Sequence, residues 1–178
     1  MMAILIHMIL VYSLAGTVLF APKYNKTYNS PNTGLRAIVI PVGKEGFEDQ
    51  ESRIEIRDAA GKLLRWRSFV SPDGEHGRGV NHAEWTADGR FFIFNAPSSG
   101  GHQPWNLATY FYGRRSNKFY SLDDYIGPVT SDFKVGRRNT IKTTRMNFQK
   151  RDEKEAVTVR LENVERESLQ KSALNKRM

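Results

Sequence analysis

The sequence contains no cysteine. This absence excludes disulfide bonds, thiolate metal ligands, cysteine nucleophiles and the lipidated cysteine of a bacterial lipoprotein. A second long apolar run is also missing after the first 21 residues, which excludes a polytopic membrane protein. Lysine and arginine (27) outnumber aspartate and glutamate (19), so the net charge is +8, and 39% of the residues are hydrophobic. This composition is too apolar for a disordered chain, and the length of 178 residues suits one domain.

Formal charge is absent from residues 3–21, which read AILIHMILVYSLAGTVLFA. Such a stretch near the N-terminus is typical of a signal peptide, and Ser13 and Ala15 offer small residues at a cleavage site. The run also nearly matches the roughly 20 residues that span a bilayer. We therefore expect residues 1–21 to be a helical signal peptide or an uncleaved membrane anchor. An exported chain without cysteine fits the bacterial periplasm or cell envelope better than a eukaryotic exterior.

Turn-forming residues dominate residues 22–34, and we expect this segment to be a linker. Beyond it, short apolar runs alternate with turn signals at intervals of about 8–12 residues, which is typical of an all-β domain. We expect this domain to cover residues 35–163. Residues 164–178 are polar and are expected to form a tail or a short helix. The predicted strands are residues 35–42, 53–57, 63–70, 80–86, 91–95, 107–112, 119–122, 140–148 and 156–163.

One segment carries a family resemblance. Residues 85–94 read WTADGRFFIF, which resembles the WD40-like repeat of TolB-type periplasmic proteins, W-S-x-D-G-K/R followed by an apolar strand. The resemblance implies that Asp88 and Gly89 take the hairpin positions with positive φ. It also implies that Trp85 packs between blades and that the following strand is buried on both faces. One blade would then run from Val80 to Leu122, with a partial blade before it and another over residues 133–163.

These observations predict an all-β fold of antiparallel sheets of propeller-blade type, with two to three blade-like units. A closed propeller needs about 4–8 blades. Residues 22–178 supply at most three, so we do not expect a closed monomeric propeller. A structural subunit that self-associates to complete a ring, as a homo-oligomer, is one alternative for the function.

Aromatic residues suggest a binding surface. Tyr110 and Tyr112 share one face of a predicted strand, because side chains alternate along a strand. Exposed aromatic rings stack well on sugar rings or on a peptide. These two tyrosines are predicted binding residues, together with His102 and Trp105 in the segment before the strand. Packing of the two tyrosines between sheets is the alternative.

Three histidines and one carboxylate suggest a different chemistry. His82 and Glu84 share a strand face, and with His76 or His102 they have the ligand types of a two-histidine, one-carboxylate metal site. A metal-assisted hydrolase using His76, His82, Glu84 and His102 is therefore the second alternative. Ordinary hydrogen bonding is the other interpretation of these side chains. The sequence holds neither the nucleophile elbow G-x-S-x-G nor the glycine-rich phosphate-binding loop with G-K-[ST], so we assign no catalytic residue and expect no cofactor.

The leading prediction is accordingly a non-enzymatic binding or interaction module. Basic pairs such as Arg137-Arg138 and Lys150-Arg151 make the C-terminal quarter the most basic part of the chain. Positive charge attracts acidic partners over a long range. Because the chain is expected to be exported, we predict a protein or an anionic envelope component as partner, and no nucleic acid.

Overall fold

The computed structural model describes residues 25–42, 50–99, 105–150 and 153–175. These residues form three antiparallel sheets and two helices. The strands are β1 (Lys26–Asn29), β2 (Arg36–Pro41), β3 (Ser52–Arg57), β4 (Leu63–Ser68), β5 (His82–Trp85), β6 (Phe91–Asn95), β7 (Thr109–Gly113), β8 (Lys118–Ser121), β9 (Lys134–Val135), β10 (Thr140–Asn147) and β11 (Glu153–Arg160). The helices are α1 (Asp123–Ile126) and α2 (Leu161–Asn175), and no described helix is long and apolar enough to cross a membrane.

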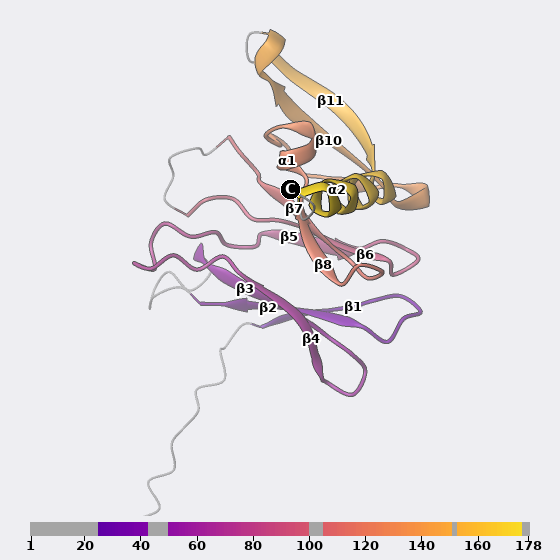
Figure 1. Cartoon of the computed structure of the whole chain (residues 1–178). Helices are drawn as coiled ribbons and strands as arrows, with labels where there is room; N and C mark the ends of the chain where they lie inside the picture. The colour runs from indigo at the N-terminus through magenta and orange to yellow at the C-terminus, as the bar shows by residue number, and fades with distance from the viewer. Residues whose placement is uncertain (1–24, 43–49, 100–104, 151–152, 176–178) are drawn as a thin grey trace, which may run out of the picture.

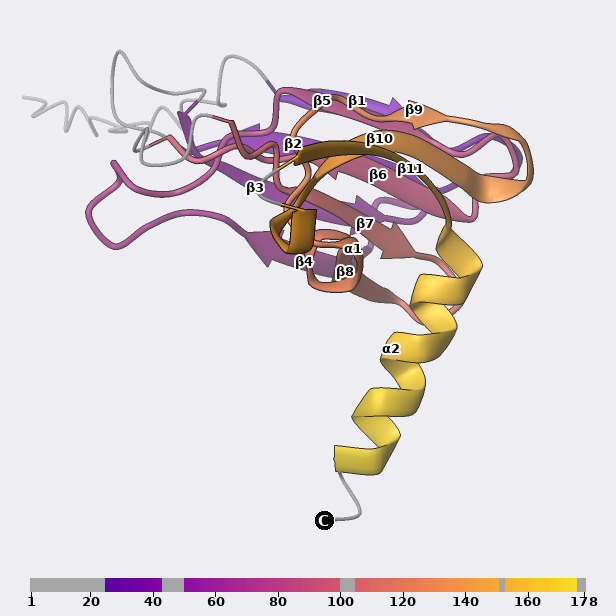
Figure 2. The same ribbon diagram turned by 90° about the horizontal axis from the view of Figure 1, so that it is seen from above.

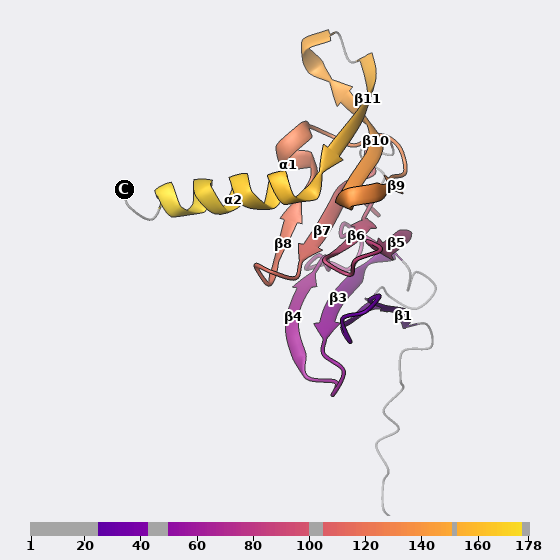
Figure 3. The ribbon, with the colours of Figure 1, turned by 90° about the vertical axis from the view of Figure 1, so that its right-hand side faces the viewer.

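The three sheets are stacked in chain order, as Figure 1 shows, and α2 extends away from them in the view from above (Figure 2). The first sheet has the order β1-β2-β3-β4, the second β5-β6-β7-β8 and the third β11-β10-β9. The strand that comes first in the sequence in each sheet, namely β1, β5 and β9, lies toward the same side of the molecule, as Figure 3 shows. Two contacts join these strands. The indole N–H of Trp85 on β5 donates to the carbonyl of Tyr28 on β1 (2.9 Å), and His82 at the start of β5 stacks on Phe133 beside β9.

This arrangement confirms the predicted all-β class. Meandering four-stranded sheets that stack face to face, with their first strands aligned, are blades of propeller type. The described residues contain two such units and a third of three strands, and they close no ring. The unit predicted for residues 80–122 is the second sheet, and α2 is the expected short C-terminal helix. The N-terminal helix expected over residues 1–21 lies outside the described residues.

The second sheet is the centre of the fold because it is buried on both faces. Along β6, Phe92 and Phe94 pack toward the first sheet, whereas Phe91 and Ile93 pack toward the third. All four are at most 1% exposed. Burying each such side chain stabilises the fold by roughly 1.5–3 kcal/mol. The continuous apolar run of this strand thus joins two separate cores.

The turn between β5 and β6 differs from the prediction in one detail. Gly89 has φ of 67°, but Asp88 does not have a positive φ. Asp88 instead accepts hydrogen bonds from the Thr86 hydroxyl (2.8 Å) and the Arg90 amide (3.0 Å), as aspartate commonly does in turns. A Cβ at Gly89 would come within 2.4 Å of the Pro31 carbonyl oxygen, so glycine also permits this turn to pack on the β1–β2 turn.

Two boundaries differ from the prediction. The expected linker at residues 22–34 contains β1, because its turn signals belong to the β1–β2 hairpin, where Asn32 and Gly34 have positive φ. The last strand ends at Arg160, three residues before its expected end at residue 163, and α2 begins at Leu161. Leu161 continues the alternation of the strand, but it also pairs with Val164 at helical spacing, and both are fully buried.

The outer faces of the first and third sheets are both basic. Strand alternation and pairing place Arg36, Arg53 and Arg57 around Glu55 on the outer face of the first sheet, on the side opposite the buried Ala37 and Val39. On the outer face of the third sheet they place Lys134, Lys142, Lys154 and Arg160. The strand positions that share this second face carry no carboxylate.

Candidate functional site

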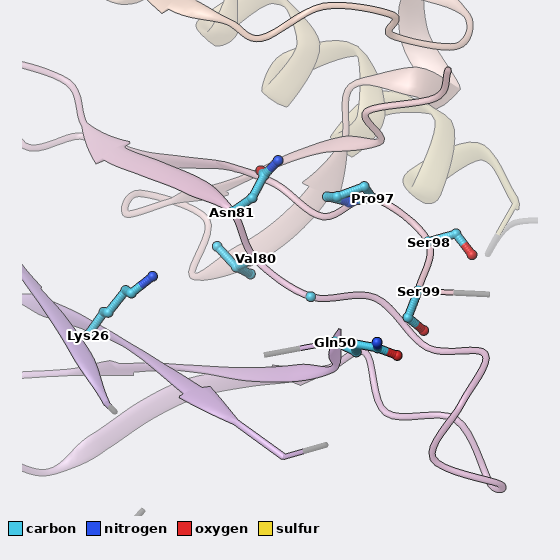
Figure 4. Close-up of a pocket in the computed structure, with 8 residues that line it drawn as sticks. Lys26, Gln50, Val80, Asn81, Pro97, Ser98 and Ser99 are labelled. Atoms are coloured by element: carbon cyan, nitrogen blue, oxygen red, sulfur yellow. The ribbon is translucent and has the colours of Figure 1, made fainter. Parts of the chain in front are cut away.

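A hollow of about 340 Å³ lies at the end of the first two sheets where β1 and β5 begin (Figure 4). Its described lining consists of Lys26, Gln50, Gly79, Val80, Asn81, Pro97, Ser98 and Ser99. These residues come from four separate segments that the stacking of the two sheets brings together. They offer one ammonium group, two amides and two hydroxyls, and no carboxylate. The hollow therefore presents one positive charge and uncharged polar side chains that can donate or accept hydrogen bonds.

A buried carboxylate holds in place the loop that leads into one wall of this hollow. Glu51 is fully buried at the start of β3 and accepts hydrogen bonds from the Gly77 amide (2.6 Å) and from the amide and hydroxyl of Ser71 (3.1 and 2.5 Å). A Cβ at Gly77 would lie 2.3 Å from the Phe69 carbonyl oxygen, so only glycine fits there. Glu51 thus holds the long loop from Ser71 to Gly79 against the first sheet.

The opposite wall is fixed to that loop by backbone bonds. The Ser99 amide donates to the Gly77 carbonyl (3.0 Å), and the Ser99 hydroxyl reaches the carbonyls of Glu75 and Gly77 (both 3.0 Å). The Arg78 guanidinium donates to the Ala96 carbonyl (3.1 Å). Residues 96–99 are therefore held to the loop before β5.

A chain of polar side chains lies at the same end of the second sheet. His82 Nδ1 lies 2.8 Å from Asp132 Oδ1, which also accepts a hydrogen bond from the Asn95 amide. Asn95 in turn accepts from the hydroxyl of Thr109 (2.9 Å), and both residues are fully buried. Buried polar groups need such partners. This network ties β5, β6 and β7 to the segment before β9.

Asp123 extends this connection to the first helix. Its carboxylate accepts hydrogen bonds from the backbone amides of Thr109 (2.9 Å) and Val129 (3.3 Å). Burial raises the pKa of Asp123, and these two amide bonds only partly offset that effect. The carboxylate is a structural anchor between β7 and the loop that follows α1.

The residues predicted as metal ligands are only partly brought together. His82 and Glu84 are neighbours on β5, with 4.0 Å between Nε2 and Oε1. His76 lies in the exposed loop, where its Nδ1 is 2.5 Å from Asp73. Hydrogen bonds from Glu75, Ser71 and His76 hold the pKa of Asp73 well below its usual range. Among the residues that the structure describes, no three His, Asp or Glu side chains cluster as metal ligands, and His102 lies outside them.

The predicted aromatic surface does not form as an exposed platform. Tyr112 is 1% exposed, and its hydroxyl donates to Asn117 (3.0 Å). Tyr110 is half-buried between the Phe94 ring, at 5.6 Å, and the Arg67 guanidinium, at 4.6 Å. The first sheet covers this face, which is why the tyrosines pack between sheets. Trp105 is half-buried at the start of its segment, and His102 is again outside the described residues.

The sequence did not point to the residues that line the hollow. Lys26 is the first residue of β1, and Gln50 and Asn81 lie just before β3 and β5 without any recognisable motif. Asn95 did carry a signal, because an amide that ends a run of buried aromatic residues must find buried partners.

Comparisons with known proteins give a fold-level likeness. No protein-family model matches the sequence, and no curated protein sequence matches it either. Among solved structures, the chain is similar to the β-propeller domain of the Trilobed protease from Pyrococcus furiosus, which has an open velcro topology. The TM-score is 0.42 at 8% identity, over 77% of this chain. The chain spans 43% of that structure's length.

Proposed function

We propose that this protein is a non-enzymatic binding module of a bacterial cell envelope that binds an anionic envelope component in the hollow between its first two sheets. The lining of the hollow carries the proposal. Lys26 supplies a positive charge, and the side chains of Asn81, Gln50 and Ser98 can donate hydrogen bonds, as an anionic group requires. A carboxylate or phosphate group would meet no negative charge from the described lining.

We also propose that the protein is exported and that its blades are related to TolB-type repeats. The uncharged residues 3–21 and the absence of cysteine support delivery to the envelope. The segment from Trp85 to Phe94 supports a relationship of the blades to TolB-type repeats, since Trp85 packs between two sheets and Gly89 has positive φ. Cell fractionation, with mass spectrometry of the native N-terminus, tests the first of these. Recovery in the cytosol with residues 1–21 intact would contradict it.

Titration by NMR tests the hollow directly. We expect glycerol phosphate, a phosphate probe, or N-acetylmuramic acid, a carboxylate probe, to shift the amide signals of Asn81, Ser98 and Ser99. The Lys26→Gln variant should weaken this binding by about two- to fivefold, as loss of one partly exposed ion pair does. Lys62→Gln is the matched control, because Lys62 is an exposed lysine in the β3–β4 turn. No shift with either probe, or equal weakening in both variants, would refute the proposal.

A further inference from the structure

The hairpin of β10 and β11 extends away from the rest of the protein (Figures 1 and 3). Its strands pair over eight residues each, from Thr140 with Arg160 to Asn147 with Glu153. At its far end the chain makes a short 3₁₀ turn, Phe148–Lys150, in which all three residues are exposed. Phe148 is 62% exposed, among the most exposed large hydrophobic side chains of the described residues.

The exposure of Phe148 is not a consequence of a loose hairpin. Arg145 on β10 forms an ion pair with Glu155 on β11 (2.9 Å) and donates to the carbonyl of Ile126 (2.7 Å). The Met146 amide donates to the carbonyl of Pro128 (2.8 Å). The contacts to the segment after α1 therefore reach Met146, two residues before Phe148, and they fix the position of the tip while leaving Phe148 exposed.

Lysines lie in the turn of this aromatic residue and on the outer face of the hairpin. Lys150 lies in the same turn, and Lys154 lies on the outer face of β11 close to the tip. Lys142 and Lys134 continue that face toward the base of the hairpin. The nearby carboxylates of Glu153 and Glu155 lie on the opposite face by strand alternation, and Glu155 is already paired with Arg145 and Asn147.

We propose that the tip and outer face of this hairpin dock on the surface of an anionic phospholipid bilayer. An exposed aromatic side chain lowers its free energy by entering the boundary between headgroups and acyl chains, and lysines beside it are attracted to anionic headgroups. A linear polyanion would satisfy the lysines but would leave Phe148 in water. The combination of both features favours the bilayer. This surface is separate from the hollow, so the proposal does not depend on what the hollow binds.

The absence of cysteine gives a site-specific test in the full chain. A single cysteine introduced by Gln149→Cys carries an environment-sensitive fluorophore at the tip, and Ala60→Cys carries it at the exposed β3–β4 turn as a control. We expect vesicles of phosphatidylglycerol and phosphatidylethanolamine to shift the emission of the tip label to shorter wavelength. Vesicles of phosphatidylcholine should not, and neither vesicle should affect the control label. Because the readout is local, an apolar N-terminal segment in the same chain does not produce it.

Charge and aromatic variants separate the two contributions. In the labelled chain, Lys150→Gln with Lys154→Gln should weaken the response to anionic vesicles about 25-fold, at roughly fivefold per lysine. Phe148→Ser should weaken it at least about tenfold. The matched control is Lys62→Gln with Lys118→Gln, which removes the same charge from exposed positions elsewhere. The proposal is overturned if the tip label ignores anionic vesicles, responds equally to neutral ones, or responds equally in both double variants while circular dichroism shows them folded.

Discussion

Replacement of Glu51 tests whether one buried carboxylate organises the loop end of the molecule. Glu51 is fully buried and accepts bonds from the amides of Ser71 and Gly77 and from the Ser71 hydroxyl. In Glu51→Ala the Ser71 hydroxyl keeps Asp73 as a partner (2.8 Å), so the half-buried amide of Ser71 and the buried amide of Gly77 lose theirs. At about 1–3 kcal/mol for each unsatisfied group, partly offset because no charge is then buried, we expect a loss of about 3 kcal/mol.

Glu51→Gln refines this test. The glutamine keeps an acceptor for the Gly77 amide but turns an NH₂ group toward the Ser71 amide, so we expect a smaller loss of about 2 kcal/mol. Urea denaturation gives the free energy of unfolding, and hydrogen exchange follows the amides of Ser71 and Gly77. The reasoning is refuted if Glu51→Ala costs less than about 1 kcal/mol, or if those two amides exchange no faster than in the unmodified protein.

Three further predictions concern the contacts between sheets. Gly89→Ala should lower the free energy of unfolding, measured by urea denaturation, by about 2–4 kcal/mol, because strain at positive φ adds to a clash with the Pro31 carbonyl. Gly61 has a positive φ but no such clash, so Gly61→Ala should cost about 1 kcal/mol, and equal losses in the two variants would contradict this account. Asn139→Ala should lower the free energy of unfolding by about 2–4 kcal/mol, since the Asn139 side-chain amide donates to Asp88 and Glu162 (2.8 and 2.7 Å) and asparagine tolerates the positive φ at this position. A change below about 1 kcal/mol in thermal or urea unfolding would exclude a stabilising role for Asn139. Partial burial acts to raise the pKa of Asp88, but hydrogen bonds from Asn139, Thr86 and Arg90 outweigh it and lower the pKa. The stability that this group contributes is therefore present above pH about 4 and lost as the pH falls further. Urea denaturation at about pH 5 and pH 3 should show a smaller loss of stability on acidification in Asp88→Asn than in the unmodified protein.

The sequence predicts the second sheet well because its signals are local. The turn residues before Phe91 and the unbroken apolar run after them identify a hairpin and a strand buried on both faces. The first sheet was less predictable. The short strand β1 lies among turn-forming residues and is recognised only by its pairing with β2.

The candidate site was beyond sequence reasoning for a different reason. Lys26, Gln50 and Asn81 meet only because two sheets stack, and no local pattern encodes that stacking. The same limitation explains why the sequence left open whether Tyr112 is exposed or buried. Strand alternation placed it correctly on one face with Tyr110, but whether that face is open or covered depends on the first sheet.

The charges on the two outermost sheet surfaces have a consequence for assembly. If copies added end to end, the arginines around Glu55 on one copy would approach the lysines of β9, β10 and β11 on the next. Mutual repulsion opposes that contact, and a stack that never closes would otherwise grow into a fibre. A stack of blades that does not close into a ring can thus expose both of its outer sheet faces to solvent and still resist polymerisation into fibres.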